Sequence, residues 1–280
     1  MNIRICEEGK QRMEIYFCPL FSGSSGNSLF CQYGETRLLI DAGKPGRSVT
    51  EALLSIGVEP ESLSGLLITH EHSDHISGAG VLARKYQLPI YATRGTWLGM
   101  EDKIGKVSAN LRREFRAGQD FYIGDIGVES FSIPHDAADP VGFRLWGGEL
   151  SAGVATDLGY FPQEVYSHLA GSSLVLLESN HDPDMLRANP HYNAALKSRI
   201  LGERGHLSNE TSSRALLALI ASGTSNIVLG HLSGENNTPE LALRVAEDAM
   251  REAGMTPGKE AQVEVTLRDR RGKLYRIAGE

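Results

Sequence analysis

The chain has 280 residues, of which 41% are apolar and 22% charged, and its 35 acidic residues outnumber its 28 lysines and arginines to give a formal net charge of −7. These values are close to the average for globular domains and exclude a disordered, collagen-like or small disulfide-stapled protein. With no apolar run near the ~20 residues of a membrane span, no secretion signal and no CxxC among Cys6, Cys18 and Cys31, we expect a cytoplasmic protein with reduced thiols and no membrane partner.

Residues 1–12 are polar and carry no hydrophobic period, which predicts a flexible N-terminal tail, and we expect residues 13–280 to form a single domain. In the first half of the domain, short β-rich runs separated by Gly and Ser predict strands, and three segments between them predict helices. In chain order, strands are expected at 13–21, 28–33, 36–43, 65–70 and 89–95, and helices at 49–57, 81–87 and 97–103.

The second half of the domain repeats this alternation of strands and helices. Thr238 can cap a helix with Pro239 at its first position, which predicts a helix over 238–254. Strands in two successive batches, with helices between and after them, indicate an α/β (α+β) protein with two helix-covered sheets. Further strands are expected at 121–123, 128–134, 141–147, 150–156, 173–179, 226–231, 262–267 and 273–279, and helices at 161–170, 183–201 and 208–222.

The strongest chemical signal is the string THEHSDH at residues 69–75. His70 and His72 lie two residues apart at the end of a β-rich run, where side chains at i and i+2 point the same way and can reach one ion. Asp74 and His75 follow where the chain turns, and they can reach a second ion. A mixed imidazole and carboxylate set suits Zn²⁺ first, with Mn²⁺ or Fe as alternatives, rather than Ca²⁺.

One segment cannot fill two coordination shells, so further ligands are expected at other strand ends. His135, Asp157 and His231 each follow an apolar run, at the point where a chain leaves its sheet and a site can form. With the histidine string, they complete a candidate centre for two divalent metal ions.

These motifs resemble those of the metallo-β-lactamase fold superfamily: Asp41 in LLIDAG, the THEHSDH string, His135, Asp157 in ATDLG and His231 in GHLS. The resemblance implies a four-layer αββα sandwich with the metals at one edge. It also implies His70, His72 and His135 on the first metal, Asp74, His75 and His231 on the second, and Asp157 between them. Asp41 would orient a ligand histidine from outside the coordination shell.

Within the superfamily, the segments between His135, Asp157 and His231 are too short for the RNA-gripping arm of tRNA 3′-processing enzymes or for a β-CASP domain. The strings SGSSGNS, THEHSDHISG, ESNHDPDML and RILGERGHLSN resemble the YycJ/WalJ family of exonuclease-like metallohydrolases, which is related to cyclic phosphodiesterases and tRNase Z. That resemblance implies a phosphodiesterase or DNA exonuclease that uses a metal-bridging hydroxide.

For this hydrolysis Asp74 would also orient the nucleophile, and His206 is the candidate that protonates the leaving oxygen. His206 precedes the helix expected over 208–222, whose N-terminus favours anions. By comparison with tRNA-processing relatives, Glu178 would support His206. Substrate contacts are expected from four residues, Ser24, Ser25, Asn27 and His181.

Two alternatives stay open at this point. One is a small-molecule (cyclic) phosphodiesterase or an ester or lactone hydrolase, and the other is a metal-bearing sensor or scaffold with little turnover. The acidic net charge predicts no extended basic track, which favours a DNA end or another short phosphodiester entering a positive pocket. A homodimer is also left open.

Overall fold

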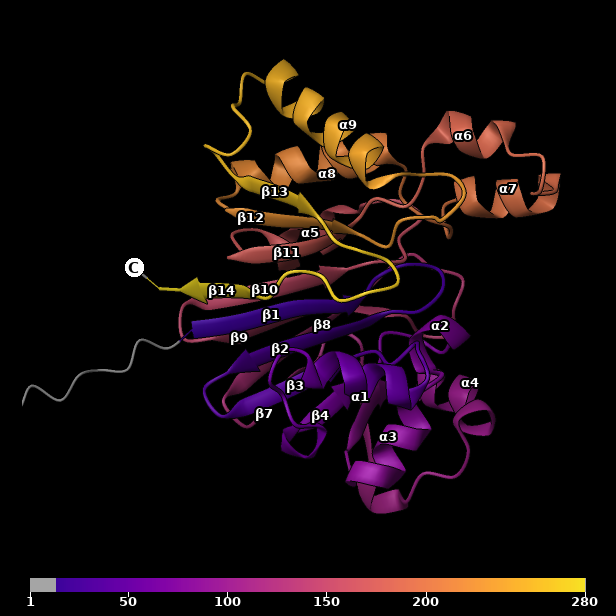
Figure 1. Ribbon diagram of the computed structural model, residues 1–280, viewed down its shortest axis with the longest axis vertical. Coiled ribbons are helices and arrows are strands. Elements are labelled where there is room, and N and C mark those ends of the chain that lie inside the picture. The colour runs from indigo at the N-terminus through magenta and orange to yellow at the C-terminus, as the bar shows by residue number, and fades with distance from the viewer. Residues whose placement is uncertain (1–13, 280) are drawn as a thin grey trace, which may run out of the picture.

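Two seven-stranded sheets face each other in the computed structural model, which describes residues 14–279. Helices cover both outer faces: α1 and α3 lie outside one sheet, and α8 and α9 lie outside the other (Figure 1). The αββα sandwich predicted from the sequence is confirmed. The tail predicted for residues 1–12 lies outside the described residues. No helix in the range 14–279 has both the length and the apolar character needed to cross a bilayer.

The first sheet has the order β14-β1-β2-β3-β4-β5-β6. Its first three pairings are antiparallel, and β3 to β6 run parallel. Its strands are β1 (Glu14–Phe21), β2 (Ser28–Tyr33), β3 (Thr36–Ile40), β4 (Gly65–Leu67), β5 (Ile90–Thr93), β6 (Arg112–Phe115) and β14 (Tyr275–Ala278).

The second sheet has the order β13-β12-β11-β10-β9-β8-β7, with β10 to β13 parallel and β7 to β10 antiparallel. Its strands are β7 (Asp120–Ile123), β8 (Ile126–Ser132), β9 (Val141–Gly147), β10 (Leu150–Ala155), β11 (Leu174–Glu178), β12 (Asn226–Gly230) and β13 (Gln262–Val265).

The helices lie in the connections between these strands. They are α1 (Gly46–Leu54), α2 (Ser73–Ile76), α3 (Ala79–Tyr86), α4 (Arg94–Ile104), α5 (Gln163–Leu169), α6 (Pro183–Ala188), α7 (Ala194–Leu201), α8 (Asn209–Ala221) and α9 (Pro239–Glu252), with short 3₁₀ turns at Pro60–Ser62 and Ala109–Leu111.

The central strands of each sheet are buried on both faces, because their alternating side chains enter two different cores. In β11, Leu174 and Leu176 pack between the sheets, whereas Val175 and Leu177 pack under α5, α8 and α9. A third core lies between the first sheet and the helices α1, α3 and α4. This double burial explains why the strands read as continuous apolar runs.

The differences from the expected organisation include a split helix, an unexpected edge strand and an unexpected sheet pairing. The helix expected over 183–201 is split into α6 and α7, because Pro190 interrupts it and the Asn193 side chain caps the second helix. The strand β6 was not expected, since only Phe115 in it is buried. The last strand, β14, returns to the first sheet and pairs with β1, so the two batches of strands do not map one to one onto the two sheets.

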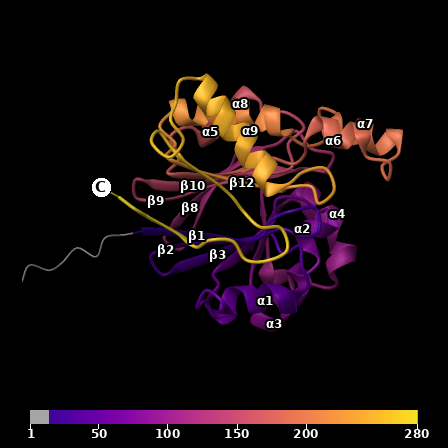
Figure 2. The ribbon, with the colours of Figure 1, turned by 45° about the horizontal axis from the view of Figure 1, so that its top comes forward.

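One edge of the sandwich collects the chain segments that carry the predicted site. The strands β3 and β4 end there from one sheet, and β8, β10, β11, β12 and β13 end there from the other, since parallel strands share a carboxyl edge. Figures 1 and 2 place α2, α6 and α7 at this end of the molecule, opposite the C-terminus.

Candidate metal centre

Three predicted site residues occupy a backbone conformation that L-residues seldom adopt. Asp41 has φ 58°, Asp157 φ 64° and His231 φ 56°, and each directly follows or closely follows a strand. The fourth non-glycine residue with positive φ in the described chain is Gln87, at the end of α3. Such a conformation costs about 1–2 kcal/mol per residue, so its concentration at three strand ends indicates that side-chain placement at this edge is under functional constraint.

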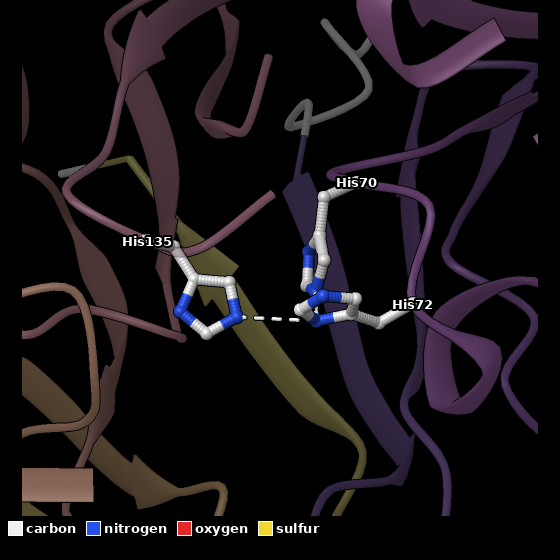
Figure 3. A group of neighbouring side chains, drawn as sticks. All are labelled: His70, His72 and His135. Atoms are coloured by element: carbon white, nitrogen blue, oxygen red, sulfur yellow. Dashed lines mark hydrogen bonds between the residues drawn. The ribbon is translucent and has the colours of Figure 1, made fainter. Parts of the chain in front are cut away.

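The rings of His70, His72 and His135 converge from two sheets (Figure 3). The Nε2 atom of His70 lies 3.1 Å from Nδ1 of His72, which lies 3.3 Å from Nε2 of His135. Two imidazole nitrogens that bind one zinc ion in tetrahedral geometry lie about 3.3 Å apart, from bonds of 2.0–2.1 Å. The three nitrogens are therefore spaced as ligands of a single ion.

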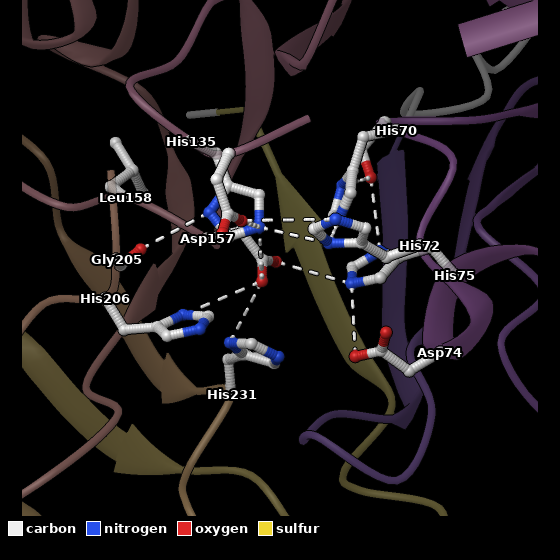
Figure 4. Close-up of polar contacts among 12 residues, drawn as sticks. His70, His72, Asp74, His75, His135, Asp157, Leu158, Gly205, His206 and His231 are labelled. Carbon is white, nitrogen blue, oxygen red and sulfur yellow. Dashed lines mark hydrogen bonds and ion pairs between the residues drawn. The ribbon is translucent and has the colours of Figure 1, made fainter. Parts of the chain in front are cut away.

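A second group brings together Asp74, His75 and His231, and Asp157 lies between the two groups (Figure 4). The Asp157 carboxylate is 3.4 Å from Nε2 of His75 through one oxygen and 3.8 Å from Nε2 of His135 through the other. Oδ2 of Asp157 and Nε2 of His231 are buried without a hydrogen-bond partner. Buried polar atoms are rarely left unpaired, so this donor set fits a second cation.

The outer nitrogens of these rings are held by oxygen atoms. Nδ1 of His75 donates to the buried Asp41 carboxylate over 2.7 Å, and Asp41 also accepts from the Thr69 backbone N–H and hydroxyl. Nδ1 of His135 donates to the Gly205 carbonyl over 3.3 Å. A proton placed on this nitrogen leaves the other nitrogen with a lone pair toward the cluster, the usual arrangement of metal-binding histidines.

Glu178 is fully buried at the end of β11 and joins two histidines. Its Oε1 accepts from Nδ1 of both His206 and His231, each over 2.8 Å, and its Oε2 accepts from the backbone N–H of Leu158 and Leu207. Burial by itself raises the pKa of Glu178, but the charge of His206 and these hydrogen bonds outweigh it and hold the pKa at about 2. The bond to His206 was expected, whereas the bond to His231 was not.

Burial and the nearby carboxylates shift the pKa values of the histidines in the candidate metal centre. Burial lowers the pKa of His75, but the nearby Asp41 and Asp157 carboxylates outweigh it and raise this pKa to about 10. Burial likewise lowers the pKa of His231, yet the charge of Asp157 raises it to about 9. His70, by contrast, has its pKa held well below the usual range by burial. The carboxylates thus require positive charge beside them, which divalent cations can supply.

His206 lies beside the two groups and forms a further candidate group with Asp157, Glu178 and His231, whose ligand atoms lie within 4.8 Å of one another. Within residues 14–279 its Nε2 has no hydrogen-bond partner. Its side chain is 20% exposed, its Nδ1 donates to Glu178, and its ring centre lies 5.3 Å from those of both His135 and His231. The bond to Glu178 directs Nε2 away from the carboxylate. A group bound at the metal edge can therefore meet this nitrogen.

The four residues expected to contact substrate occupy different surroundings. Ser24 and Ser25 are exposed, and Ser25 donates to Asp269 over 2.5 Å. Asn27 is buried: its carbonyl oxygen accepts from the Gly23 N–H, and its amide lies 3.0 Å from Nε2 of His75. His181 is 1% exposed, has no hydrogen-bond partner for either ring nitrogen, and belongs to none of the metal-binding groups in the described chain. Substrate contact by these residues stays a prediction.

Asp136 was missed by the sequence analysis although it follows His135 directly. Its Oδ1 is buried without a hydrogen-bond partner and lies 3.4 Å from Nε2 of His135, while its Oδ2 accepts from Arg199. The sequence signal that could have identified Asp136 is its position directly after the predicted ligand His135. Asp136 links the metal edge to α7, which carries Arg199.

Comparison with known proteins identifies the family of this chain. A family model described as a beta-lactamase superfamily domain matches residues 36–232. The exodeoxyribonuclease WalJ of Streptococcus pneumoniae (strain D39) is 40% identical over 260 residues, which cover 92% of this chain and 96% of the relative. The exodeoxyribonuclease YycJ of Bacillus anthracis is 39% identical over 254 residues, 91% of this chain and 96% of the relative.

Solved structures show the same fold. The metallo-beta-lactamase fold protein YhfI of Bacillus subtilis superposes with a TM-score of 0.72 at 16% identity, covering 95% of this chain and 100% of its own. The short form of human tRNase Z gives 0.61 at 14% identity, covering 94% and 100%. The family resemblance expected from the sequence motifs is confirmed: the chain belongs to the beta-lactamase superfamily and is a relative of the WalJ and YycJ proteins.

Proposed function

We propose that this protein is a binuclear metal-dependent phosphodiesterase that acts as a DNA exonuclease. The observation that carries the proposal is the convergence of six ligand-type side chains at one edge, with the Asp157 carboxylate between them and His206 beside them. The two exodeoxyribonuclease relatives, each aligned over more than nine-tenths of this chain, support DNA as the substrate.

In this proposal His70, His72 and His135 would hold one ion, and Asp74, His75 and His231 would hold the other. Asp157, which lies between the two groups, would be available to both. Zn²⁺ is the first choice for this nitrogen and oxygen donor set, with Mn²⁺ or Fe as alternatives. Two such ions supply Lewis-acid chemistry, because they lower the pKa of water and neutralise charge on a phosphoryl group.

The protein's own groups then orient the reactants and move a proton. Asp74, whose side chain is 26% exposed, is placed to accept a hydrogen bond from the attacking water. Glu178 holds the proton of His206 on Nδ1, so a second proton on Nε2 can pass to the leaving oxygen. Asp41 and Glu178 keep His75 and His231 in the orientation that metal binding needs.

We also propose that the protein is located in the cytoplasm, which is a reducing compartment. Its support is that Cys18 and Cys31 are buried and form no disulfide within the described chain. A homodimer is a prediction that the oligomeric state in solution would test.

The decisive experiment compares substrates on metal-loaded protein: labelled single- and double-stranded DNA, bis-p-nitrophenyl phosphate, and a lactone. Release of mononucleotides from DNA supports the proposal. Cleavage of the small diester or the lactone with DNA left intact refutes it in favour of a small-molecule hydrolase. Full metal occupancy without turnover of any substrate refutes it in favour of a sensor or scaffold. Asp74→Ala is expected to abolish all turnover.

A further inference from the structure

The connection between β13 and β14 gathers positive charge at the metal edge. It carries Arg268, Arg270, Arg271 and Lys273 with one acidic residue, Asp269, in a chain whose net charge is −7. Since β13 runs parallel to β12, this connection leaves the sheet at the edge where His231 lies. In Figures 1 and 2 it turns back at the end of the sandwich that carries α2. We call residues 266–274 the basic loop.

Short contacts tie the basic loop to the candidate metal centre. The Arg268 carbonyl accepts from the Ser22 N–H over 3.2 Å, and the Ser22 hydroxyl accepts from the His231 N–H over 2.9 Å. The Arg268 side chain packs against Gly234, where an added Cβ would lie 1.5 Å from its Nη1. One serine therefore separates the basic loop from a proposed metal ligand.

The acidic residue of the basic loop, Asp269, anchors the loop and neutralises part of its charge. Asp269 accepts from Ser25 over 2.5 Å and pairs with Lys44 and Arg268 over 3.1 and 3.2 Å. Arg270 and Arg271 are exposed, and neither forms an ion pair with a carboxylate in the range 14–279. Neither guanidinium is therefore neutralised by a described carboxylate, although Arg271 donates to the Gly272 carbonyl over 3.2 Å.

A hollow of about 390 Å³ opens beside these arginines. Arg268 and Arg270 line it together with Ser233 and Thr238, the residue that caps α9. This volume falls in the range of small-molecule pockets and is sufficient for one nucleotide unit.

We propose that the basic loop binds the phosphodiester backbone of the DNA strand whose end lies at the metals. The planar guanidinium of Arg matches phosphate oxygens in a bidentate manner, and a strand offers one phosphate per nucleotide. The inference rests on the proposed exonuclease function and adds a binding surface to it. The sequence predicts no extended basic track on the surface. The basic loop agrees with that prediction, because it is short and lies next to the candidate metal centre.

The test uses the variant Arg270→Ala/Arg271→Ala and the matched control Lys85→Ala/Lys259→Ala. Both pairs remove two exposed positive charges. Lys85 lies in the last turn of α3, before β5, and Lys259 precedes β13, so the control pair lies at the opposite end of the parallel strands from the metals. For each metal-loaded protein, kcat/KM is measured on a single-stranded oligonucleotide across a salt series and on bis-p-nitrophenyl phosphate.

Each lost phosphate contact reduces the slope of log affinity against log salt by about 0.7 for single strands, so two lost contacts reduce it by about 1.4. If the arginine variant and the wild-type protein have equal kcat/KM on DNA at 1 M salt, this difference in slope gives the variant about 25-fold lower kcat/KM at 0.1 M salt. We expect this loss in the arginine variant, with the small diester hydrolysed at the wild-type rate and wild-type metal content. The control pair is expected to retain kcat/KM on DNA and its salt slope.

Three results would overturn the inference alone: wild-type DNA kinetics in the arginine variant, an equal loss in the control pair, or an equal loss on DNA and on bis-p-nitrophenyl phosphate. The last two would indicate a general charge effect and damage to the metal centre, respectively. A wild-type enzyme that hydrolyses the small diester but not DNA would instead overturn the exonuclease function, and this inference with it.

Discussion

Replacement of Glu178 by Gln tests the most connected group of the site. The amide keeps the shape of the carboxylate, but it presents an N–H₂ group where four donors now converge on two oxygens. If the amide nitrogen faces the rings, His206 and His231 must move their protons from Nδ1 to Nε2. In His231 this change removes the lone pair from the nitrogen that faces the proposed metal.

The structure sets the size of the expected effects. Hydrogen bonds to a charged acceptor contribute about 1.5–3 kcal/mol each. Because breaking a buried ion pair from one side costs about 3–5 kcal/mol, we expect the free energy of unfolding of Glu178→Gln to fall by about that amount. Loss of a carboxylate behind a metal-binding histidine lowers metal affinity about 10- to 100-fold.

Three measurements follow: urea denaturation for stability, metal content after dialysis against a competing chelator, and kcat on bis-p-nitrophenyl phosphate. Glu129→Gln is the matched control, since Glu129 accepts from Nδ1 of His168 over 2.6 Å outside the site. We expect the control to keep its metal. Wild-type metal affinity and turnover in Glu178→Gln would refute the role assigned to this carboxylate.

The remaining predictions concern two residues at the centre and the two buried thiols. His206→Ala should lower kcat about 10²- to 10⁴-fold while metal content measured by mass spectrometry stays at the wild-type level; loss of metal would assign the ring a ligand role instead. Gly43→Ala should lower stability by about 1–3 kcal/mol or more and reduce metal content, because its Cβ would lie 1.6 Å from the Asp74 carbonyl; an unchanged melting temperature would contradict this close packing. Burial raises the pKa of Cys18 to about 11 and of Cys31 to about 12, so in a Cys6→Ser background neither thiol should react with a thiol reagent at pH 8 until the protein unfolds. Since these thiols ionise more readily in the unfolded chain, stability should fall as pH rises above about 8.5, and a flat profile from pH 8 to 10 would count against their burial.

Much of the candidate centre could be read from the sequence because its chemistry is local. His70, His72, Asp74 and His75 lie within six residues, and the end of a β-rich run fixes the direction in which they point. The apolar runs likewise determine where most strands lie, since a strand buried on both faces needs apolar side chains at every position.

Contacts between distant segments were decided only by the tertiary structure. The second bond of Glu178, to His231, depends on β11 and β12 lying side by side in parallel, and a sequence pattern contains no strand order. The pairing of β14 with β1 was missed for the same reason.

The basic loop shows the distinction most clearly. The sequence by itself determines that positive charge is concentrated between residues 268 and 273, in a chain with a net charge of −7. Only the parallel pairing of β13 with β12 carries that charge to the metal edge, where Ser22 joins Arg268 to His231. The physical reason is that local side-chain chemistry follows from the order of residues, whereas the meeting of remote charges follows from how the sheets close around their shared core.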